Sequence, residues 1–170
     1  MVYNYDNKFL VEVFNMKAIV LSDSHGDFTN VNKVLRSYSE IELVFFCGDS
    51  EGTIEKAIIN YPNKMFVAVR GNCDFASEFP IDEFMTIEGK KIMITHGHRY
   101  NVKYTQDEVI AEARNNNCDM VIYGHTHSAF TDYEDGLYIM NPGSSFGYKA
   151  TYGIIDITSN GIVTSIKNID

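Results

Sequence analysis

The first half of the chain alternates apolar runs with amphipathic segments. Three runs are almost entirely apolar, a pattern typical of parallel strands that are covered on both faces. They span residues 16–21, 43–47 and 64–69. Helices are predicted for the two segments between them, 27–35 and 52–61. In the first, Val31, Val34 and Leu35 follow at helical spacing, and residues 27–30 offer capping side chains. This alternation predicts a parallel sheet with helices on its faces.

The second half predicts shorter strands joined by tight turns. Residues 84–87 and 91–95 fit a hairpin that turns at Gly89, and residues 105–116 fit a helix capped by Thr105. Further short strands are predicted at 120–123, 129–133, 137–141, 152–157 and 162–166. We therefore expect one α/β domain, a two-sheet β-sandwich flanked by helices.

The first fifteen residues differ from the rest of the chain. They are polar and aromatic and end in the apolar stretch 9–14, directly before the first predicted strand. We expect residues 16–170 to form the domain, with Met16 as its natural start and residues 1–15 as an upstream extension. The alternative is that residues 9–14 add an edge strand or a helix.

Charge and composition narrow the classes of function. The 170 residues include 14 Lys and Arg against 23 Asp and Glu, a net charge of −9, which argues against a broad nucleic-acid surface. No apolar run approaches the roughly 20 residues of a membrane span, and no basic segment precedes an apolar one as in a secretory signal. The three cysteines are odd in number and lack CxxC spacing, so we expect reduced thiols and a cytoplasmic protein.

The histidines carry the most specific signal. All five lie in three short clusters, each of which follows a predicted strand, and Gly48-Asp49 and Gly71-Asn72 follow two further strands. The clusters are Asp23-Ser24-His25, His96-Gly97-His98 and His125-Thr126-His127. Ligands of open α/β sheets gather at the carboxyl ends of the strands, so these segments are expected to meet at one edge. Any one of them alone has an ordinary explanation as a cap, a turn or a loop contact.

Together these residues predict a metal site. In extended backbone, residues i and i+2 point the same way, so Asp23 with His25, and His125 with His127, are expected to reach one ion together. Carboxylate, imidazole and amide ligands suit Mn, Fe, Zn or Ni rather than Ca. Seven such ligands exceed the needs of one ion and fit two divalent ions about 3.5–4 Å apart that share a carboxylate.

These motifs carry a resemblance. In order along the chain they resemble the calcineurin-like metallophosphoesterase superfamily, which has an αββα fold. The segments 69–74, Thr95-His96-Gly97-His98 and Asn141-Pro142-Gly143-Ser144 are similar to the small YfcE-like phosphodiesterase family. The resemblance implies that a hydroxide bridging the two ions attacks phosphorus. It assigns Asp23, His25 and His127 to the first metal and Asn72, His96 and His125 to the second, with Asp49 between them.

The same resemblance suggests further catalytic residues. Many superfamily members have a histidine that protonates the leaving group where this chain has Cys73. The YfcE-like family resembles this chain in having a cysteine there. We therefore expect slow hydrolysis of poor leaving groups and a preference for activated aryl phosphodiesters. His98 is the remaining candidate acid, and Asn72 is a candidate catalytic residue as well as a ligand. The candidate phosphate contacts are Arg70, Arg99 and Lys149.

The sequence thus favours a phosphodiesterase that acts on a small phosphodiester with two divalent ions, Mn²⁺ first and Ni²⁺, Fe, Zn²⁺ or Mg²⁺ as alternatives. Two other functions stay open: a catalytically weak scaffold, as in the retromer subunit related to this fold, and a phosphomonoesterase. A metal-storage or sensing protein would not need mixed ligands around an open position. Aromatic residues could line a substrate cleft or an interface between copies of a homo-oligomer; they are Tyr100, Tyr104, Phe130 and Tyr148.

Overall fold

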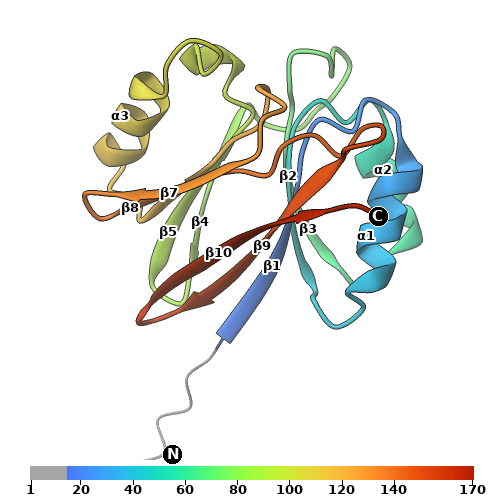
Figure 1. Cartoon of the computed structure of the whole chain (residues 1–170), viewed down its shortest axis with the longest axis horizontal. Coiled ribbons are helices and arrows are strands. Elements are labelled where there is room, and N and C mark those ends of the chain that lie inside the picture. Colours follow the sequence, from blue (N-terminus) through green and yellow to red (C-terminus); the bar gives the residue numbers. More distant parts are fainter. Residues whose placement is uncertain (1–14) are drawn as a thin grey trace, which may run out of the picture.

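The computed structural model describes residues 15–170, which form two five-stranded sheets and three α-helices (Figure 1). The expectations for residues 1–14 lie outside the described part of the chain and stay predictions. β1 begins at Asn15, one residue before Met16, and Asn15 pairs with Thr158. Within the described residues, no helix is both long and apolar enough to cross a membrane.

The first sheet has the strand order β10-β9-β1-β2-β3. β1, β2 and β3 are parallel to one another, as the apolar runs predict, whereas β9 runs antiparallel to β1 and β10 antiparallel to β9. The strands are β1 (Asn15–Leu21), β2 (Leu43–Cys47), β3 (Met65–Val69), β9 (Thr151–Thr158) and β10 (Gly161–Asn168).

The second sheet has the order β4-β5-β6-β8-β7. β5, β6 and β8 are parallel, and the antiparallel strands β4 and β7 form the two edges. The predicted hairpin joins β4 to β5 through Glu88 and Gly89, both with positive φ. The strands are β4 (Asp82–Ile87), β5 (Lys90–Thr95), β6 (Met120–Ile122), β7 (Phe130–Glu134) and β8 (Leu137–Asn141).

The sequence of β2 shows how the layers form. All five of its residues are buried, because alternate side chains face opposite sides of the strand. Leu43, Phe45 and Cys47 pack between the two sheets, and Val44 and Phe46 pack beneath the helices of the first sheet. The expected αββα sandwich is confirmed.

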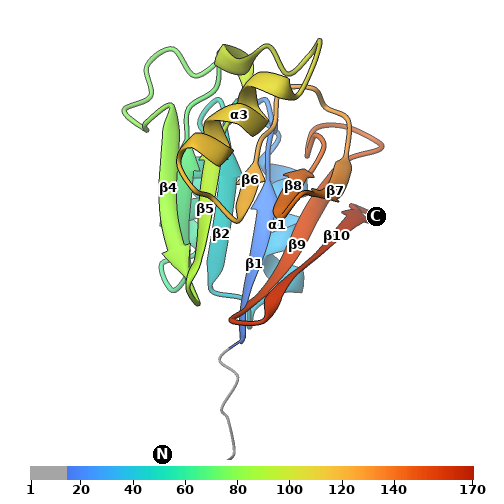
Figure 2. The ribbon, with the colours of Figure 1, turned by 90° about the vertical axis from the view of Figure 1, so that its left-hand side faces the viewer.

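The helices cover the two outer faces of the sandwich. α1 (Phe28–Ser37) and α2 (Thr53–Asn60) pack on the first sheet. Asp27 caps α1 by accepting hydrogen bonds from the backbone N–H of Thr29 and Asn30. α3 (Asp107–Asn115) lies across the second sheet and buries Val109 and Ala113 there (Figure 2).

The predicted cap of α3 is wrong. The helix begins at Asp107, with Gln106 at the N-cap and no side-chain cap. The Thr105 hydroxyl accepts a hydrogen bond from Asp107 N (3.2 Å), a local turn that precedes the helix rather than opening it. Two of the aromatic residues considered for a substrate cleft or an interface have contacts within the fold: Tyr100 donates to Asp82 (2.9 Å), and Phe130 packs against the core beside α3.

Candidate metal centre

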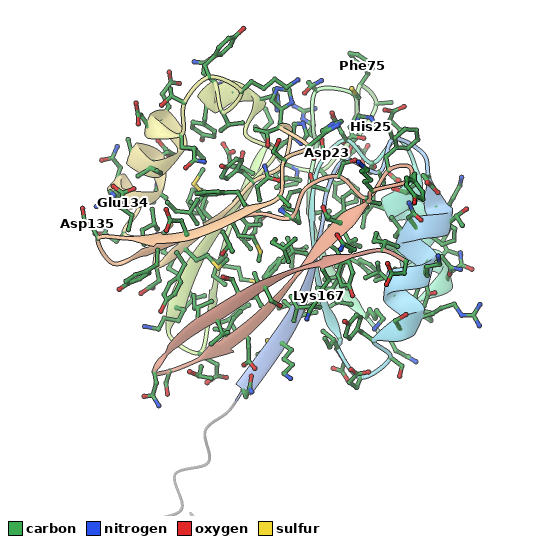
Figure 3. The ribbon with its side chains drawn as sticks, in the orientation of Figure 1. Asp23, His25, Phe75, Glu134, Asp135 and Lys167 are labelled. Atoms are coloured by element: carbon green, nitrogen blue, oxygen red, sulfur yellow. The ribbon has the colours of Figure 1, made fainter. Side chains whose placement is uncertain are left out.

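The candidate residues lie in the loops that follow β1, β2, β3, β5 and β6. These loops meet at one end of the sandwich, where Asp23 and His25 lie, and Lys167 of β10 lies well away from them (Figure 3). The loop after β1 is joined to the loop after β2 by backbone hydrogen bonds from Asp23 N to Gly48 O and from His25 N to Asp49 O, both 3.0 Å. The parallel strands therefore bring segments distant in sequence to one edge, as the strand pattern predicts.

The expected local conformation is wrong. The candidate ligands do not continue the strands in extended backbone, because five of them have positive φ. The φ angles are 52° at Asp23, 43° at His25, 51° at Asp49, 67° at His125 and 58° at His127. Left-handed conformations are uncommon for residues other than glycine, and their concentration here marks a strained site. Residues i and i+2 still converge, because each loop turns sharply where its strand ends.

The first group of ligands consists of Asp23, His25 and His127, whose ligand atoms all lie within 4.8 Å of one another. Nε2 of His127 lies 3.2 Å from Nε2 of His25 and 3.2 Å from Oδ1 of Asp23. Asp23 is fully buried and half of the His127 side chain is exposed, so the group opens toward solvent. The Asp23 carboxylate, with Oδ1 3.2 Å from Nε2, raises the pKa of His127.

The second group contains Asp49, His96 and His125, again within 4.8 Å, and Asn72 joins it. Nε2 of His96 is the centre of this group. It lies 3.2 Å from Asn72 Oδ1, 3.3 Å from Asp49 Oδ2 and 3.2 Å from His125 Nδ1. The structure therefore brings together both sets of residues that the resemblance assigns to two metals.

The charges of the second group are strongly coupled. Although burial opposes ionisation, hydrogen bonds from His96 and from the backbone N–H of Cys73 hold the pKa of Asp49 well below its usual range. Burial alone would lower the pKa of His96, but the hydrogen bond to Asp49 and the charges of Asp23 and Asp49 raise it overall. Burial, the charge of His96 and the charge of Lys103 lower the pKa of His125 to about 4. In the protein without metal, Asp49 and His96 thus favour each other's charged forms.

The surroundings of the Asp23 carboxylate indicate whether these residues fit a cation. Its Oδ2 accepts hydrogen bonds from Ser22 Oγ (2.6 Å) and His125 N (3.0 Å), whereas its Oδ1 is buried and has no hydrogen-bond partner among residues 15–170. That oxygen lies 3.2 Å from His127 Nε2 and 4.0 Å from His96 Nε2, between the two groups. A buried carboxylate oxygen without a donor is costly unless a cation lies against it, so the residues fit metal ions. Asp49, expected between the metals, groups here with the second set, and its shared role stays a prediction.

Two glycines allow the loops to approach this closely. A Cβ on Gly71 would lie 2.7 Å from Asp49 Cγ, and one on Gly124 would lie 2.7 Å from Asp23 Oδ2. Both glycines have φ outside the left-handed region, so space rather than backbone freedom requires them. They explain why Gly precedes Asn72 and His125 in the motifs.

The three residues with candidate catalytic roles are placed differently. Asn72 is exposed and joins the second group, and its Nδ2 lies 3.3 Å from Cys73 Sγ. Burial and the nearby carboxylate of Asp49 raise the pKa of Cys73 to about 11. The His98 ring lies 5.4 Å from that of His96, and its Nδ1 is buried and has no hydrogen-bond partner among the residues that the structure describes. Burial and the charge of His96 lower the pKa of His98, which favours a neutral imidazole.

The expected phosphate contacts differ in their surroundings. Arg70 donates to Ser77 O at 3.4 Å, within the loop that follows β3. Arg99 is exposed beside His98, and Lys149 lies in an exposed loop with Tyr148. The sequence analysis missed Lys103, whose positive charge lowers the pKa of both His125 and His127.

Two acidic residues were also missed. Asp74 belongs to the quoted motif, and its carboxylate accepts from the backbone N–H of Ser50 (2.9 Å), Glu51 (2.8 Å) and Gly71 (2.8 Å), which ties the loops after β2 and β3 together. Glu51 Oε1 lies 2.7 Å from His25 Nδ1. Nothing in its local sequence pattern singles Glu51 out, because the contact joins two different loops.

The segment Asn141-Pro142-Gly143-Ser144 is hydrogen-bonded to the loops that carry candidate ligands. Asn141 is fully buried and donates to Gly124 O (2.8 Å) and to Thr126 Oγ1 (3.0 Å). Ser144 Oγ donates to Asp23 O at 2.7 Å. These bonds hold the loops that carry Asp23, His125 and His127.

Comparison with known families agrees with this geometry. The family described as the calcineurin-like phosphoesterase superfamily domain matches residues 16–160. The chain belongs to this family. The calcineurin-like phosphoesterase match spans both ligand groups and all strands from β2 to β9.

Several relatives in this superfamily have names. The chain is 32% identical over 130 residues to the probable metallophosphoesterase YsnB of Bacillus subtilis, covering 76% of this chain and 75% of the relative. It is 30% identical over 160 residues to phosphodiesterase MJ0936 of Methanocaldococcus jannaschii, covering 83% and 93%. Phosphodiesterase YfcE of Escherichia coli is 27% identical over 168 residues (83% and 88%), consistent with the YfcE-like resemblance.

The fold is shared more widely than the sequence. Vacuolar Protein Sorting 29 from Cryptosporidium parvum superposes with a TM-score of 0.74 at 16% identity, covering 91% of this chain and 98% of that protein. At that identity the similarity concerns the fold alone.

Proposed function

We infer that the chain is a metal-dependent phosphodiesterase that uses two divalent ions. The observation that carries this inference is the buried Oδ1 of Asp23, which has no hydrogen-bond partner in the described part of the chain and lies between two groups of imidazoles. The names of the relatives support a hydrolase of phosphate esters, and two of them are phosphodiesterases.

The chain's own residues would hold the ions in two sets. Asp23, His25 and His127 would hold one, and Asn72, His96 and His125 the other, with Asp49 proposed between them. The mixed oxygen and nitrogen donors suit Mn²⁺ first, with Ni²⁺, Fe, Zn²⁺ and Mg²⁺ as alternatives. When bound, two such ions supply an activated water and positive charge against the phosphoryl oxygens.

The remaining side chains bind the substrate and move protons. Lys103 and the two ions would give an acidic protein a locally positive site for a phosphate. His98, whose Nδ1 has no partner within residues 15–170, is the proposed donor to the leaving group. Its lowered pKa favours the neutral ring, so only a minor protonated form would donate and poor leaving groups would react slowly. Cys73 keeps its proton, because its pKa is about 11, so it cannot replace an imidazolium as an acid near neutral pH. Activated aryl phosphodiesters, which need little protonation, are therefore the favoured substrates.

The experiment compares hydrolysis of bis(p-nitrophenyl) phosphate and p-nitrophenyl phosphate. The protein is stripped with a chelator, refilled with Mn²⁺, and assayed beside His125→Ala and Asp49→Ala. Glu134→Ala, which removes a carboxylate at the far end of β7, is the matched control (Figure 3). Metal-dependent diester cleavage that both site variants lose and the control keeps is the expected result.

Two other outcomes would replace this function. Faster turnover of the monoester would make the chain a phosphomonoesterase. No turnover with both ions bound would favour a scaffold on the same fold, the alternative that the family resemblance leaves open.

A further inference from the structure

Glu51 contacts a candidate ligand without belonging to either ligand group that the family resemblance assigns. Its Oε1 lies 2.7 Å from Nδ1 of His25, and the other ring nitrogen of His25, Nε2, faces His127 at 3.2 Å. A carboxylate only accepts hydrogen bonds, so the proton in this contact lies on Nδ1. The lone pair of Nε2 is then left free on the side of Asp23 and His127.

The backbone holds Glu51 in this position. Its own N–H donates to the buried carboxylate of Asp74 at 2.8 Å, and its φ of 48° is left-handed. A glutamate in that conformation is uncommon and requires support from its surroundings. The next residue, Gly52, also has positive φ and forms the N-cap of α2, so the side chain leaves a fixed turn between β2 and α2.

The His25 ring has further contacts but no other partner for Nδ1 among the described residues. Its backbone N–H donates to Asp49 O, and the ring of Phe146 lies edge-on to it with the centroids 6.1 Å apart. Phe146 packs against the ring without fixing which nitrogen carries the proton. Glu51 is therefore the residue that determines the tautomer of His25.

We propose that Glu51 is a positioning residue, which accepts the Nδ1–H of His25 and thereby directs Nε2 into the group formed with Asp23 and His127. The proposal rests on the proposed metal-dependent function. Carboxylates that accept the second N–H of a ligating histidine fix its tautomer and raise its basicity, and their loss costs about 10- to 100-fold in metal affinity.

A different arrangement of the same residues is a separate metal site. His25, Glu51 and Cys73 also have ligand atoms within 4.8 Å of one another. Two ligands of one tetrahedral zinc ion lie about 3.3 Å apart, whereas the 2.7 Å between Glu51 and His25 is a hydrogen-bond distance. The contact between nitrogen and oxygen therefore favours positioning over shared coordination.

The test uses Glu51→Ala and Glu51→Gln, with Glu55→Ala as the matched control. Glu55 is an exposed carboxylate on α2, so its removal changes the local charge equally without touching His25. The first measurement is the histidine tautomer in the metal-free protein, by ¹⁵N-correlated NMR, with His25→Gln to assign the signal. We expect Nδ1–H in the wild type and in Glu55→Ala, and a mixture of tautomers in Glu51→Ala.

The second measurement is Mn²⁺ affinity by calorimetry. Glu51→Ala should bind one of the two ions roughly 10-fold more weakly. Glu51→Gln should recover part of this affinity, because its amide oxygen can still accept a hydrogen bond from Nδ1–H of His25. Excess Mn²⁺ should restore kcat for bis(p-nitrophenyl) phosphate in Glu51→Ala, which a structural defect would not allow.

The proposal is overturned if Glu51→Ala keeps the wild-type tautomer and Mn²⁺ affinity. It is also overturned if the wild type binds a third ion, such as Zn²⁺, that both Glu51→Ala and Cys73→Ser lose. Failure of the proposed function would look different. The wild type would then lack diester cleavage, while the tautomer measurement would still test Glu51.

Discussion

Nδ1 of His96 donates a hydrogen bond to the backbone carbonyl oxygen of Cys47 at 2.7 Å. Cys47 is the last residue of β2, and both residues are fully buried. The bond fixes the proton on Nδ1 and leaves Nε2 facing Asp49, Asn72 and His125. A central strand of the sandwich thus orients a candidate ligand through its backbone, which no side-chain variant of Cys47 would remove.

Substitution of His96 should therefore remove one metal selectively. In His96→Asn the side-chain amide can still donate to Cys47 O, but no nitrogen reaches the position of Nε2. We expect the Mn²⁺ stoichiometry to fall from two ions to one, with loss of diester cleavage, because the second group loses its central ligand. Elemental analysis and calorimetry measure the stoichiometry.

His98→Asn is the comparison for that variant. Its ring lies 5.4 Å from that of His96 but contacts none of the carboxylates in the ligand groups. It should keep both ions and instead lower turnover of esters with poor leaving groups. If His96→Asn also binds two ions, the assignment of His96 to the second group is wrong.

The approach of Gly71 to Asp49 makes a steric prediction. A Cβ at residue 71 would lie 2.5 Å from the backbone nitrogen of Asp49 and 2.7 Å from its Cγ, so Gly71→Ala must displace this loop together with the carboxylate. We expect Mn²⁺ affinity to fall roughly 10-fold or more and the thermal midpoint to fall as well, because the clash includes backbone.

Gly147→Ala is the matched control for Gly71→Ala. Nothing lies within 4 Å of a Cβ there, although φ is +73°, so the substitution should cost about 1 kcal/mol of stability and leave metal binding unchanged. Thermal unfolding and Mn²⁺ titration of both variants separate the two effects. Equal metal affinity in Gly71→Ala and the wild type would contradict the prediction.

The sequence predicted the layers well because its continuous apolar runs correspond to strands that are buried on both faces. β2 is buried on both faces and matches its predicted boundaries, 43–47, and the ligand motifs follow strands whose carboxyl ends must meet. The sequence did not predict how the ligands converge. Positive φ at Asp23 and His25 depends on hydrogen bonds to the loop after β2, which are contacts between segments distant in sequence.

The same limit explains the missed residues. Glu51 and Lys103 act on histidines more than twenty residues away, and Asp74 joins its own loop to Ser50 and Glu51, so a local pattern does not reveal these roles. The prediction of the α3 cap failed for a different reason. Thr105 is a residue type that often caps helices, but its hydroxyl accepts a hydrogen bond in a turn before the helix.

Lys103 should bind the substrate rather than the metal. Its charge lowers the pKa of His125 and His127, so it repels cations from both groups while it attracts a phosphate. We expect Lys103→Gln to raise KM for bis(p-nitrophenyl) phosphate roughly 10-fold, the loss of one charge-assisted contact, with Mn²⁺ affinity unchanged or higher.

Lys167→Gln is the control for this charge effect, because it removes the same charge from β10, away from Asp23 and His25 (Figure 3). Steady-state kinetics at saturating Mn²⁺ give KM and kcat for both variants. A weaker Mn²⁺ affinity in Lys103→Gln, or an equal rise of KM in both variants, would show that Lys103 does not contact the substrate.

Cys73 makes the last prediction, which concerns the missing acid. Its thiol has a pKa of about 11, raised by burial and by Asp49, so it does not protonate a leaving group at neutral pH. An imidazole at this position titrates near neutrality and supplies general-acid catalysis. Cys73→His should therefore raise kcat/KM for phenyl phosphate, which has a poor leaving group, by roughly 10-fold or more, and change kcat/KM for p-nitrophenyl phosphate little.

Cys73→Ser, which has no titratable group, is the control and should raise neither value. The metal stoichiometry of Cys73→His must stay at two ions, because a histidine beside His25 and Glu51 could itself bind metal. A ratio of the two monoester rates equal to that of the wild type, with both ions bound, would mean that an acid other than residue 73, such as His98, already serves the leaving group.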